Sequence, residues 1–390
     1  LGTNDIDYRA RVTSDEERDF LAAHVAGSAT TYRDIDTADH VALIAFEPEE
    51  ESPIVFLRLN KNFKKRGLKV SAVATKGSIA MDKLKADFIK VAPGAEASAV
   101  AGLALTAKSV ILVGERASES AGLFSAVAAL SAKTGAKIAY IPRRAGERGA
   151  LEAGALGNIL PGGRPVTDAA ARVDIAAAWG VDSLPAEIGK SADQILAAAN
   201  AGQLEALIIG GVDPFDMQQP PVNALEKTFI VSLEMRPSAI TEFADVIFPI
   251  AAVTEKSGSF MSWAGTSRSF EKAAPDADHR SDAYVLSILS DAMGTPINLT
   301  GSKAAAKEIA AVGSWDGARA TFTATQTKNL HEGVVLATWR HLLDNGSLQA
   351  NEPNLAGTAR KNLARVSAKF ATELGVKNGD LVTVSTDNAQ

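Results

Sequence analysis

The stretch His40-Val-Ala-Leu-Ile-Ala-Phe46 decides the fold of this 390-residue chain. It is short, continuously apolar and followed by an acidic turn, which is typical of a parallel strand that is buried on both faces. Residues 53–66 come next, with apolar side chains near helical spacing, basic side chains elsewhere and Gly67 as the helix stop. This strand followed by a helix indicates a fold of the α/β class.

The same alternation continues along the chain. Strands are predicted at residues 68–74, 88–91, 109–113 and 136–141, and an Ala-rich helix at 122–133. Short loops and right-handed crossovers favour a doubly wound, Rossmann-like parallel sheet in a first domain over residues 1–145. A second doubly wound domain with a glycine-rich loop is expected over residues 146–320. Its predicted elements are helices at 170–179, 193–201, 282–292 and 304–311 and strands at 206–209, 229–233 and 245–248.

Residues 321–390 are predicted to hold a linker and the truncated start of a third domain. An Ala- and Thr-rich stretch at 317–328 indicates the linker, and helices are expected near 334–343 and 368–374. The last apolar run, Leu381-Val-Thr-Val-Ser385, predicts a strand with no partner after it. Because the chain also begins without Met, we expect it to be a piece of a longer protein.

Composition excludes several functional classes. With 40 basic and 46 acidic residues the net charge is −6, so neither nucleic acid nor an anionic membrane is an expected partner. The longest apolar runs are well short of the roughly 20 residues that a membrane helix needs, so direct membrane insertion is not expected. The chain has no cysteine, which excludes disulfides and Cys-ligated zinc or iron–sulfur clusters in these residues. Its five histidines are scattered without the spacing of metal ligands.

Two glycine-containing strand ends, at residues 113–116 and 209–214, lie where open α/β sheets bind ligands. Neither has the G-x-G-x-x-G or G-x-x-x-x-G-K spacing of a phosphate cradle, and a tight turn explains both equally well. The acidic run of Glu47, Glu49, Glu50 and Glu51 resembles a divalent metal site, but a solvated turn at a helix N-terminus is the better explanation.

The stretch 142–169 breaks the strand-helix rhythm with six glycines and three prolines. Its four arginines, Arg143, Arg144, Arg148 and Arg164, could hold an anion or a carboxylate of a neighbouring protein through bidentate contacts. A solvated loop is the alternative. We expect docking to a partner protein, because a long loop with rigid charged groups gains order most readily by such a contact.

Several motifs resemble the molybdopterin oxidoreductase superfamily, and formate dehydrogenases in particular. They are Gly2-Thr-Asn-Asp-Ile-Asp7, Ala10-Arg-Val12, Asp36-Thr-Ala-Asp39, Gly210-Gly-Val-Asp-Pro214, Ala244-Asp-Val-Ile-Phe-Pro249 and Glu255-Lys-Ser-Gly-Ser-Phe260. Within this superfamily, residues 142–154 and 160–165 resemble the actinobacterial family of G-type subunits of the NADH-quinone oxidoreductases (complex I). The resemblance covers nearly the whole chain. It implies two Rossmann-like domains followed by the start of the family's C-terminal β-barrel domain.

The sequence departs from the family at positions that would hold its cofactor. Catalytic relatives have a Cys or selenocysteine molybdenum ligand directly after A-R-V and a His behind it, where this chain has Thr13 and Ser14. The G-x-N-P turn that faces the pterin nucleotide contains Phe46 and Glu47 here, and Gly211 and Asp213 lie in the second cofactor-facing turn. A hydroxyl is a poor substitute for a soft thiolate on the metal. We therefore expect these six residues to line a vestigial cleft, with no cofactor, no metal and no catalytic residue.

The resemblance implies a non-catalytic scaffold within a proton-translocating NADH:quinone oxidoreductase. This scaffold would lie in the peripheral arm, on the cytoplasmic side of the bacterial inner membrane, and contact other peripheral-arm subunits of complex I. Iron–sulfur clusters that relay electrons from NADH to quinone are expected in an N-terminal region outside this chain. Two alternatives stay open: an active molybdopterin-guanine-dinucleotide oxidoreductase such as a formate dehydrogenase, and a free-standing α/β module that binds a small ligand. Thr13 and Phe46 favour the scaffold over the first alternative.

Overall fold

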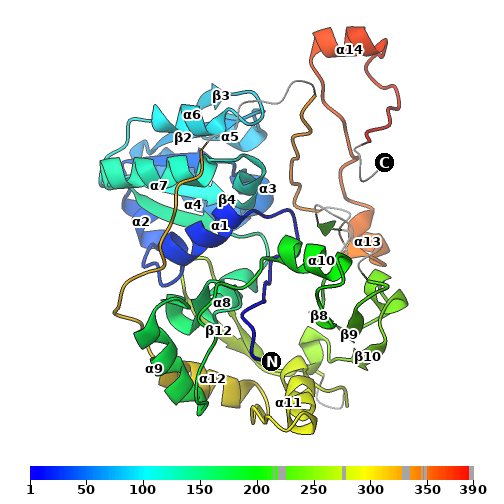
Figure 1. Cartoon of the computed structure of the whole chain (residues 1–390). Helices are drawn as coiled ribbons and strands as arrows, with labels where there is room; N and C mark the ends of the chain where they lie inside the picture. The colour runs from blue at the N-terminus through cyan, green and yellow to red at the C-terminus, as the bar shows by residue number, and fades with distance from the viewer. Residues whose placement is uncertain are drawn as a thin grey trace. The chain divides into compact units, whose positions relative to one another are not determined.

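The computed structural model describes residues 1–213, 216–217, 225–274, 278–326, 334–343, 346 and 349–385. They form two compact units, residues 1–339 and 340–390, and each is described by itself. The larger unit holds the two parallel sheets found in these residues (Figure 1). The domain boundaries expected near residues 145 and 320 stay predictions.

Five parallel strands form the first sheet. They are β1 (His40–Ile44), β2 (Lys69–Ala74), β3 (Asp87–Lys90), β4 (Val110–Gly114) and β5 (Lys137–Ile141). Their order, β3-β2-β1-β4-β5, is that of a doubly wound sheet, so the prediction from the apolar run at residues 40–46 is confirmed. The central strand β1 pairs with β2 on one side and β4 on the other, which places Val41 level with Val70 and Val110.

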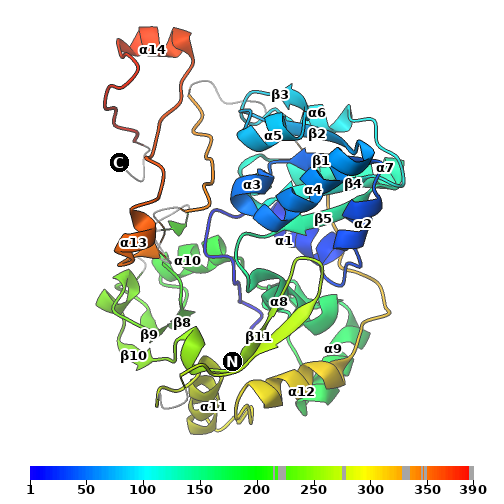
Figure 2. The ribbon, with the colours of Figure 1, turned by 180° about the vertical axis from the view of Figure 1, so that it is seen from behind.

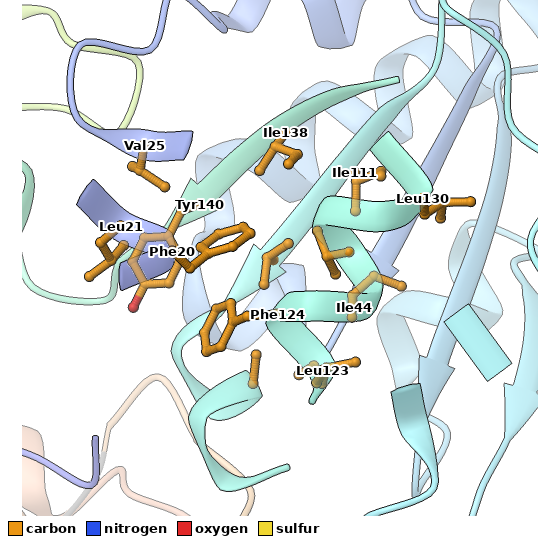
Figure 3. Packing of buried hydrophobic residues seen from close by; sticks show 14 of the residues in the cluster. Phe20, Leu21, Val25, Ile44, Ile111, Leu123, Phe124, Leu130, Ile138 and Tyr140 are labelled. Carbon is orange, nitrogen blue, oxygen red and sulfur yellow. The ribbon is translucent and has the colours of Figure 1, made fainter. Parts of the chain in front are cut away.

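Both faces of this sheet are buried, which explains why β1 is apolar at every position after His40. Alternate residues of a strand point to opposite faces, so Ala42 and Ile44 join a first hydrophobic core while Val41 and Leu43 join a second. Helices α1 (Asp15–Phe20), α6 (Glu96–Ala101) and α7 (Leu123–Thr134) cover the first core, and α2 (Tyr32–Thr37), α4 (Pro53–Arg66) and α5 (Ile79–Lys83) the second. Figure 3 shows the first core, with Phe20 against Phe124.

A second parallel sheet has the order β10-β9-β8, with β8 (Ala206–Gly210), β9 (Phe229–Glu234) and β10 (Val246–Pro249). The helices predicted in this part of the chain are present as α9 (Ala169–Trp179), α10 (Ala192–Asn200), α11 (Asp282–Ala292) and α12 (Ser302–Val312). The α/β class with two parallel sheets is therefore confirmed. Within the described ranges the second sheet runs in chain order, without the reversal of the first.

A hairpin links the second half of the larger unit to the first. Its strands, β11 (Gly258–Met261) and β12 (Ser267–Phe270), are antiparallel, and β11 runs toward α8 (Glu147–Glu152) (Figure 2). Trp263 at the hairpin tip is buried in the second core of the first sheet, edge-on to Tyr32 with ring centroids 4.7 Å apart. Its carbonyl oxygen accepts a hydrogen bond from Arg148 Nη1 at 2.9 Å. The hairpin tip is thus part of the first core layer.

The glycine-rich stretch 142–169 is folded. Besides α8 it contains a short hairpin of β6 (Ile159–Leu160) and β7 (Arg164–Pro165). Arg164 is buried and donates to the carbonyls of Pro161, Val312 and Gly313, and Arg148 is buried as well. The docking role expected for these two arginines is therefore wrong, because their donors satisfy backbone carbonyls within the unit. Arg143 and Arg144 lie 4.0 Å from Glu115 and 3.9 Å from Asp216.

Two predictions for the C-terminal residues are wrong. Residues 334–343 are extended rather than helical, because Trp339 packs against the second core and outweighs the weak helical spacing. Residues 381–385 form no strand, since none of the described residues supplies the paired backbone groups that a strand requires. The helix expected near 368–374 is confirmed as α14 (Ala368–Leu374), preceded by α13 (Pro353–Ala356). The β-barrel stays a prediction. None of the helices within the described ranges combines the length and apolarity needed to cross a membrane.

Candidate functional site

The strand order of the first sheet reverses between β1 and β4, and their carboxyl ends form the crevice where doubly wound sheets bind ligands. The base of this crevice is closed. A Cβ added at Gly114 would lie 2.5 Å from the Ala45 carbonyl oxygen and 3.2 Å from Phe46 Cα. The glycine of the motif at 113–116 is therefore required for close approach of two backbones.

Replacing Gly114 with alanine should lower the free energy of unfolding by about 1–3 kcal/mol, because β4 must shift away from β1. Urea unfolding followed by circular dichroism measures the change. Gly102→Ala is the matched control, since the nearest atom to its added Cβ is 3.5 Å away. Equal stability of the two variants would contradict the close approach.

Helix α3 (Pro48–Glu51) and its N-cap bring carboxylates into the crevice. Glu47 is 1% exposed and accepts hydrogen bonds from Glu50 N at 2.6 Å and Ser78 Oγ at 2.7 Å. Glu51 Oε1 accepts from Arg116 Nη2 at 3.0 Å and Nε at 3.1 Å. Burial raises the pKa of Glu51, and Arg116 opposes this rise. The helix N-terminus expected for the acidic run is confirmed, but its solvation is wrong for Glu47 and Glu51, which are buried.

The N-terminus of α7, the long helix after β4, holds an anion that belongs to the chain itself. Glu16 Oε2 accepts a hydrogen bond from Gly122 N at 2.8 Å, and Oε1 accepts from Ser125 N and Ser125 Oγ, both at 2.7 Å. Helix N-termini in α/β proteins bind phosphate because their N–H groups lack helical partners and the helix dipole favours negative charge. The buried Glu16 carboxylate takes that place here.

A buried ionic cluster lies near the carboxyl ends of β4 and β5. Its members are Asp7, Arg9, Arg11, Glu17, Glu115, Tyr140 and Glu147. Arg9 contacts Asp7 through Nη2 and Oδ2 at 2.6 Å and donates from Nη1 to Glu17 Oε2 at 3.0 Å. Arg11 donates to both oxygens of Glu17, at 2.8 and 3.1 Å, and to Tyr140 Oη at 2.8 Å. The extended chain at residues 7–11 thus delivers two guanidinium groups to one carboxylate.

Arg11 also approaches the remaining acids of the ionic cluster. Its Nε lies 3.4 Å from Glu115 Oε2 and 3.5 Å from Glu147 Oε1. Within the cluster two guanidinium groups face four carboxyl groups, so negative charge is in excess. Burial raises the pKa of Glu147, Arg11 opposes the rise, and Glu115 and Glu17 add to it. Folding therefore favours the protonated form of Glu147.

The pH dependence of stability should reflect the raised pKa of Glu147. The folded chain binds this proton more tightly than the unfolded chain, so the contribution is full below the ordinary pKa of 4.5 and is lost as pH rises through the folded pKa. Relative to the parent, Glu147→Gln should therefore gain stability as pH rises above 4.5. Urea unfolding over a pH series measures this, with the exposed Glu205→Gln as the control for removing one carboxylate. Parallel profiles of Glu147→Gln and the parent would refute the expectation.

Thr13 and Ser14 lie beside the ionic cluster. Thr13 is buried and its Oγ1 donates to Asp193 Oδ2 at 3.3 Å, while Ser14 Oγ caps α1 by accepting from Glu17 N at 3.1 Å. Burial raises the pKa of Asp193, and the hydrogen bond from Thr13 opposes the rise. Both hydroxyls already have structural partners, and neither is the soft thiolate that catalytic relatives offer to molybdenum. These residues do not fit the metal of the family.

The other predicted cleft residues fall in two places. Phe46 and Glu47 are at the crevice, and Phe46 is 1% exposed because its ring belongs to the second core. Gly211, with φ +62°, and Asp213 follow β8 at the carboxyl end of the second sheet. Pro214 of the same motif lies outside the described residues. In the part of the chain that the structure describes, no group of three His, Asp or Glu side chains could hold a metal ion.

Sequence reasoning missed Glu16, Glu17, Tyr140 and Glu147, which make many of the buried contacts. A signal existed for the first two, because an acidic run directly after Ser14 is the pattern of a capped helix start. No local signal marks Tyr140, since its partner Arg11 is 129 residues away in the chain.

The sequence profile of the molybdopterin oxidoreductase family matches residues 7–292, and the chain belongs to this family. It is similar to the G-type subunit of NADH-quinone oxidoreductase from Mycobacterium tuberculosis, with 47% identity over 410 residues, and from Streptomyces coelicolor, with 44% over 429 residues. Both alignments cover 99% of this chain but 50% and 51% of the relatives, so the chain spans about half their length. Formate dehydrogenase H of Escherichia coli is 31% identical over 157 residues, which cover 39% of this chain and 22% of that protein.

Proposed function

We propose that this chain is the structural scaffold portion of the G-type subunit in an NADH-quinone oxidoreductase, without redox chemistry of its own. The observation that carries the proposal is the self-filled carboxyl edge of the first sheet. Glu16 occupies the N-terminus of α7, and Glu47 and Glu51 lie in the crevice. A nucleotide phosphate would meet a carboxylate in both places, and like charges in contact are strongly unfavourable.

In the longer protein, iron–sulfur clusters outside this chain would relay electrons from NADH towards quinone. This portion would pack against the cluster-bearing region and against neighbouring peripheral-arm subunits, on the cytoplasmic side of the bacterial inner membrane. Its contacts would be with protein rather than nucleic acid or lipid. The similarity to G-type subunits over 99% of the chain supports this role.

Metal and pterin analysis of the intact complex tests the proposal. We expect molybdenum, tungsten and extracted pterin well below one equivalent per chain, and a tag on this protein should co-purify NADH-oxidising activity. Thr13→Cys should also stay free of molybdenum in cells supplied with molybdate, because Glu16 and Glu47 keep their places. The rival function, a pterin-dependent oxidoreductase akin to formate dehydrogenase, predicts stoichiometric metal in the unmodified chain. That result would overturn the scaffold.

A further inference from the structure

The larger unit has a small cavity at the carboxyl ends of β1 and β2. Ala45, Val73 and Thr75 line one side of it, and Glu96 of α6 and Leu123 of α7 line another. A further wall is formed by residues 335–338, which cross the sheet edge as extended chain. The enclosed volume is about 150 Å³. Pockets that hold cofactors or drug-sized ligands usually measure roughly 300–1,000 Å³, so little room remains beneath this segment.

Thr338 fixes the segment to the start of the α7 region through Glu119. Its Oγ1 donates to Glu119 Oε1 at 2.5 Å, and its backbone N donates to Oε2 at 3.4 Å. One carboxylate therefore receives both polar donors of a single residue. A bound peptide is commonly recognised in the same way, by one side chain that satisfies its backbone and its hydroxyl together.

Trp339 provides the second attachment. Its ring centroid lies 4.4 Å from Lys76 Nζ and 4.5 Å from Arg116 Cζ, so two cations contact one indole. The same Arg116 is held by Glu51 at 3.0 Å and is buried. The guanidinium is thus engaged by a carboxylate and by an aromatic ring, and a ligand that approached it would have to displace Trp339.

We propose that residues 335–339 act as a tethered ligand of the crevice, held in place by Thr338 and Trp339. The carboxyl edge of a doubly wound sheet is the usual place for a small molecule or nucleotide. Here the occupant is a peptide that offers a hydroxyl, a backbone N–H and an indole to one carboxylate and two cations. In the described residues its attachments run to side chains and include no strand pairing, so it can leave without disrupting the sheet. The inference goes beyond the scaffold role and does not depend on it.

Binding of the segment in trans tests the inference. In the full chain, residues 334–339 are replaced by a Gly-Ser stretch of equal length, and a fluorescently labelled peptide Val334-Val-Leu-Ala-Thr-Trp-Arg340 is added. The replaced chain should bind the peptide about tenfold more tightly than the parent, whose crevice is filled, and a Trp339→Ala peptide should lose about tenfold in affinity. Equal affinities of the two chains, or of the two peptides, would overturn the inference.

Hydrogen exchange provides a second measurement if the replacement disturbs folding. In the full chain, Trp339→Ala should raise amide exchange at residues 116–123, which border the cavity, because the segment then leaves more often. Trp179→Ala is the matched control, since it removes an indole that is exposed on α9. Unchanged exchange at residues 116–123 would mean that Trp339 does not hold the segment. The metal content of the complex bears only on the scaffold, so the two proposals fail separately.

Discussion

Replacing Arg11 with leucine should lower the free energy of unfolding by about 3–5 kcal/mol, because removal of one partner leaves buried charges without compensation. Arg11 donates to Glu17 and Tyr140 at 2.8 Å and lies within 3.5 Å of Glu147. Leucine fills part of the volume but supplies no donor, so Arg9 alone would have to compensate the acids. The urea midpoint at unchanged slope measures the loss.

Arg58→Leu is the matched control for the loss of one arginine. Arg58 is 41% exposed and pairs with Asp36, and an exposed ion pair contributes at most about 1 kcal/mol. Adding Glu17→Leu to Arg11→Leu should recover part of the stability, because one uncompensated carboxylate is then removed as well. If Arg11→Leu and Arg58→Leu unfold at the same urea concentration, the ionic cluster does not stabilise the fold.

Trp263→Ala should also cost about 3–5 kcal/mol, because it empties a large buried site in the second core. The indole is 7% exposed and lies edge-on to Tyr32 with centroids 4.7 Å apart. Its loss should also loosen the hairpin of β11 and β12, since Trp263 is the part of the hairpin that enters this core. Thermal unfolding gives the stability change, and proteolysis between residues 258 and 270 reports the release of the hairpin.

Two variants separate volume from polarity at this site. Among the described residues none accepts a hydrogen bond from the buried Nε1 of Trp263. Trp263→Phe therefore removes an unsatisfied donor while it keeps most of the apolar volume, and it should cost much less than Trp263→Ala. Trp179→Ala, on the exposed side of α9, should be nearly neutral. A Trp263→Ala variant as stable as Trp179→Ala would show that the hairpin tip is not part of the core.

The elements of the first sheet could be predicted because their signals are local. The apolar run at residues 40–46 contains β1, and helix α4 has the predicted bounds, since Pro53 can start a helix and Gly67 can adopt the left-handed conformation that ends it. The helix expected near residues 334–343 failed for the opposite reason. Its conformation depends on Lys76 and Arg116, which are distant in sequence and meet Trp339 only in the folded chain.

The candidate site was only partly predictable. The sequence shows which groups depart from the family at Thr13 and Glu47, but it does not show what replaces the cofactor contacts. That role belongs to pairs such as Glu16 with Ser125 and Arg11 with Tyr140, which are 109 and 129 residues apart in the chain. The arginines of the glycine-rich stretch were misjudged for a related reason, since Arg164 finds its carbonyl partners near residue 312.

The Glu16 carboxylate on the N-terminus of α7 makes the loss of a cofactor hard to reverse in evolution. A departing phosphate exposes helix N–H groups, and a carboxylate of the same chain covers them without the entropy cost of binding a separate molecule. Once Glu16 bonds Gly122 and Ser125, a return to phosphate binding must first remove a stabilising side chain. A protein with this arrangement can mature and assemble in a cell that makes no molybdopterin.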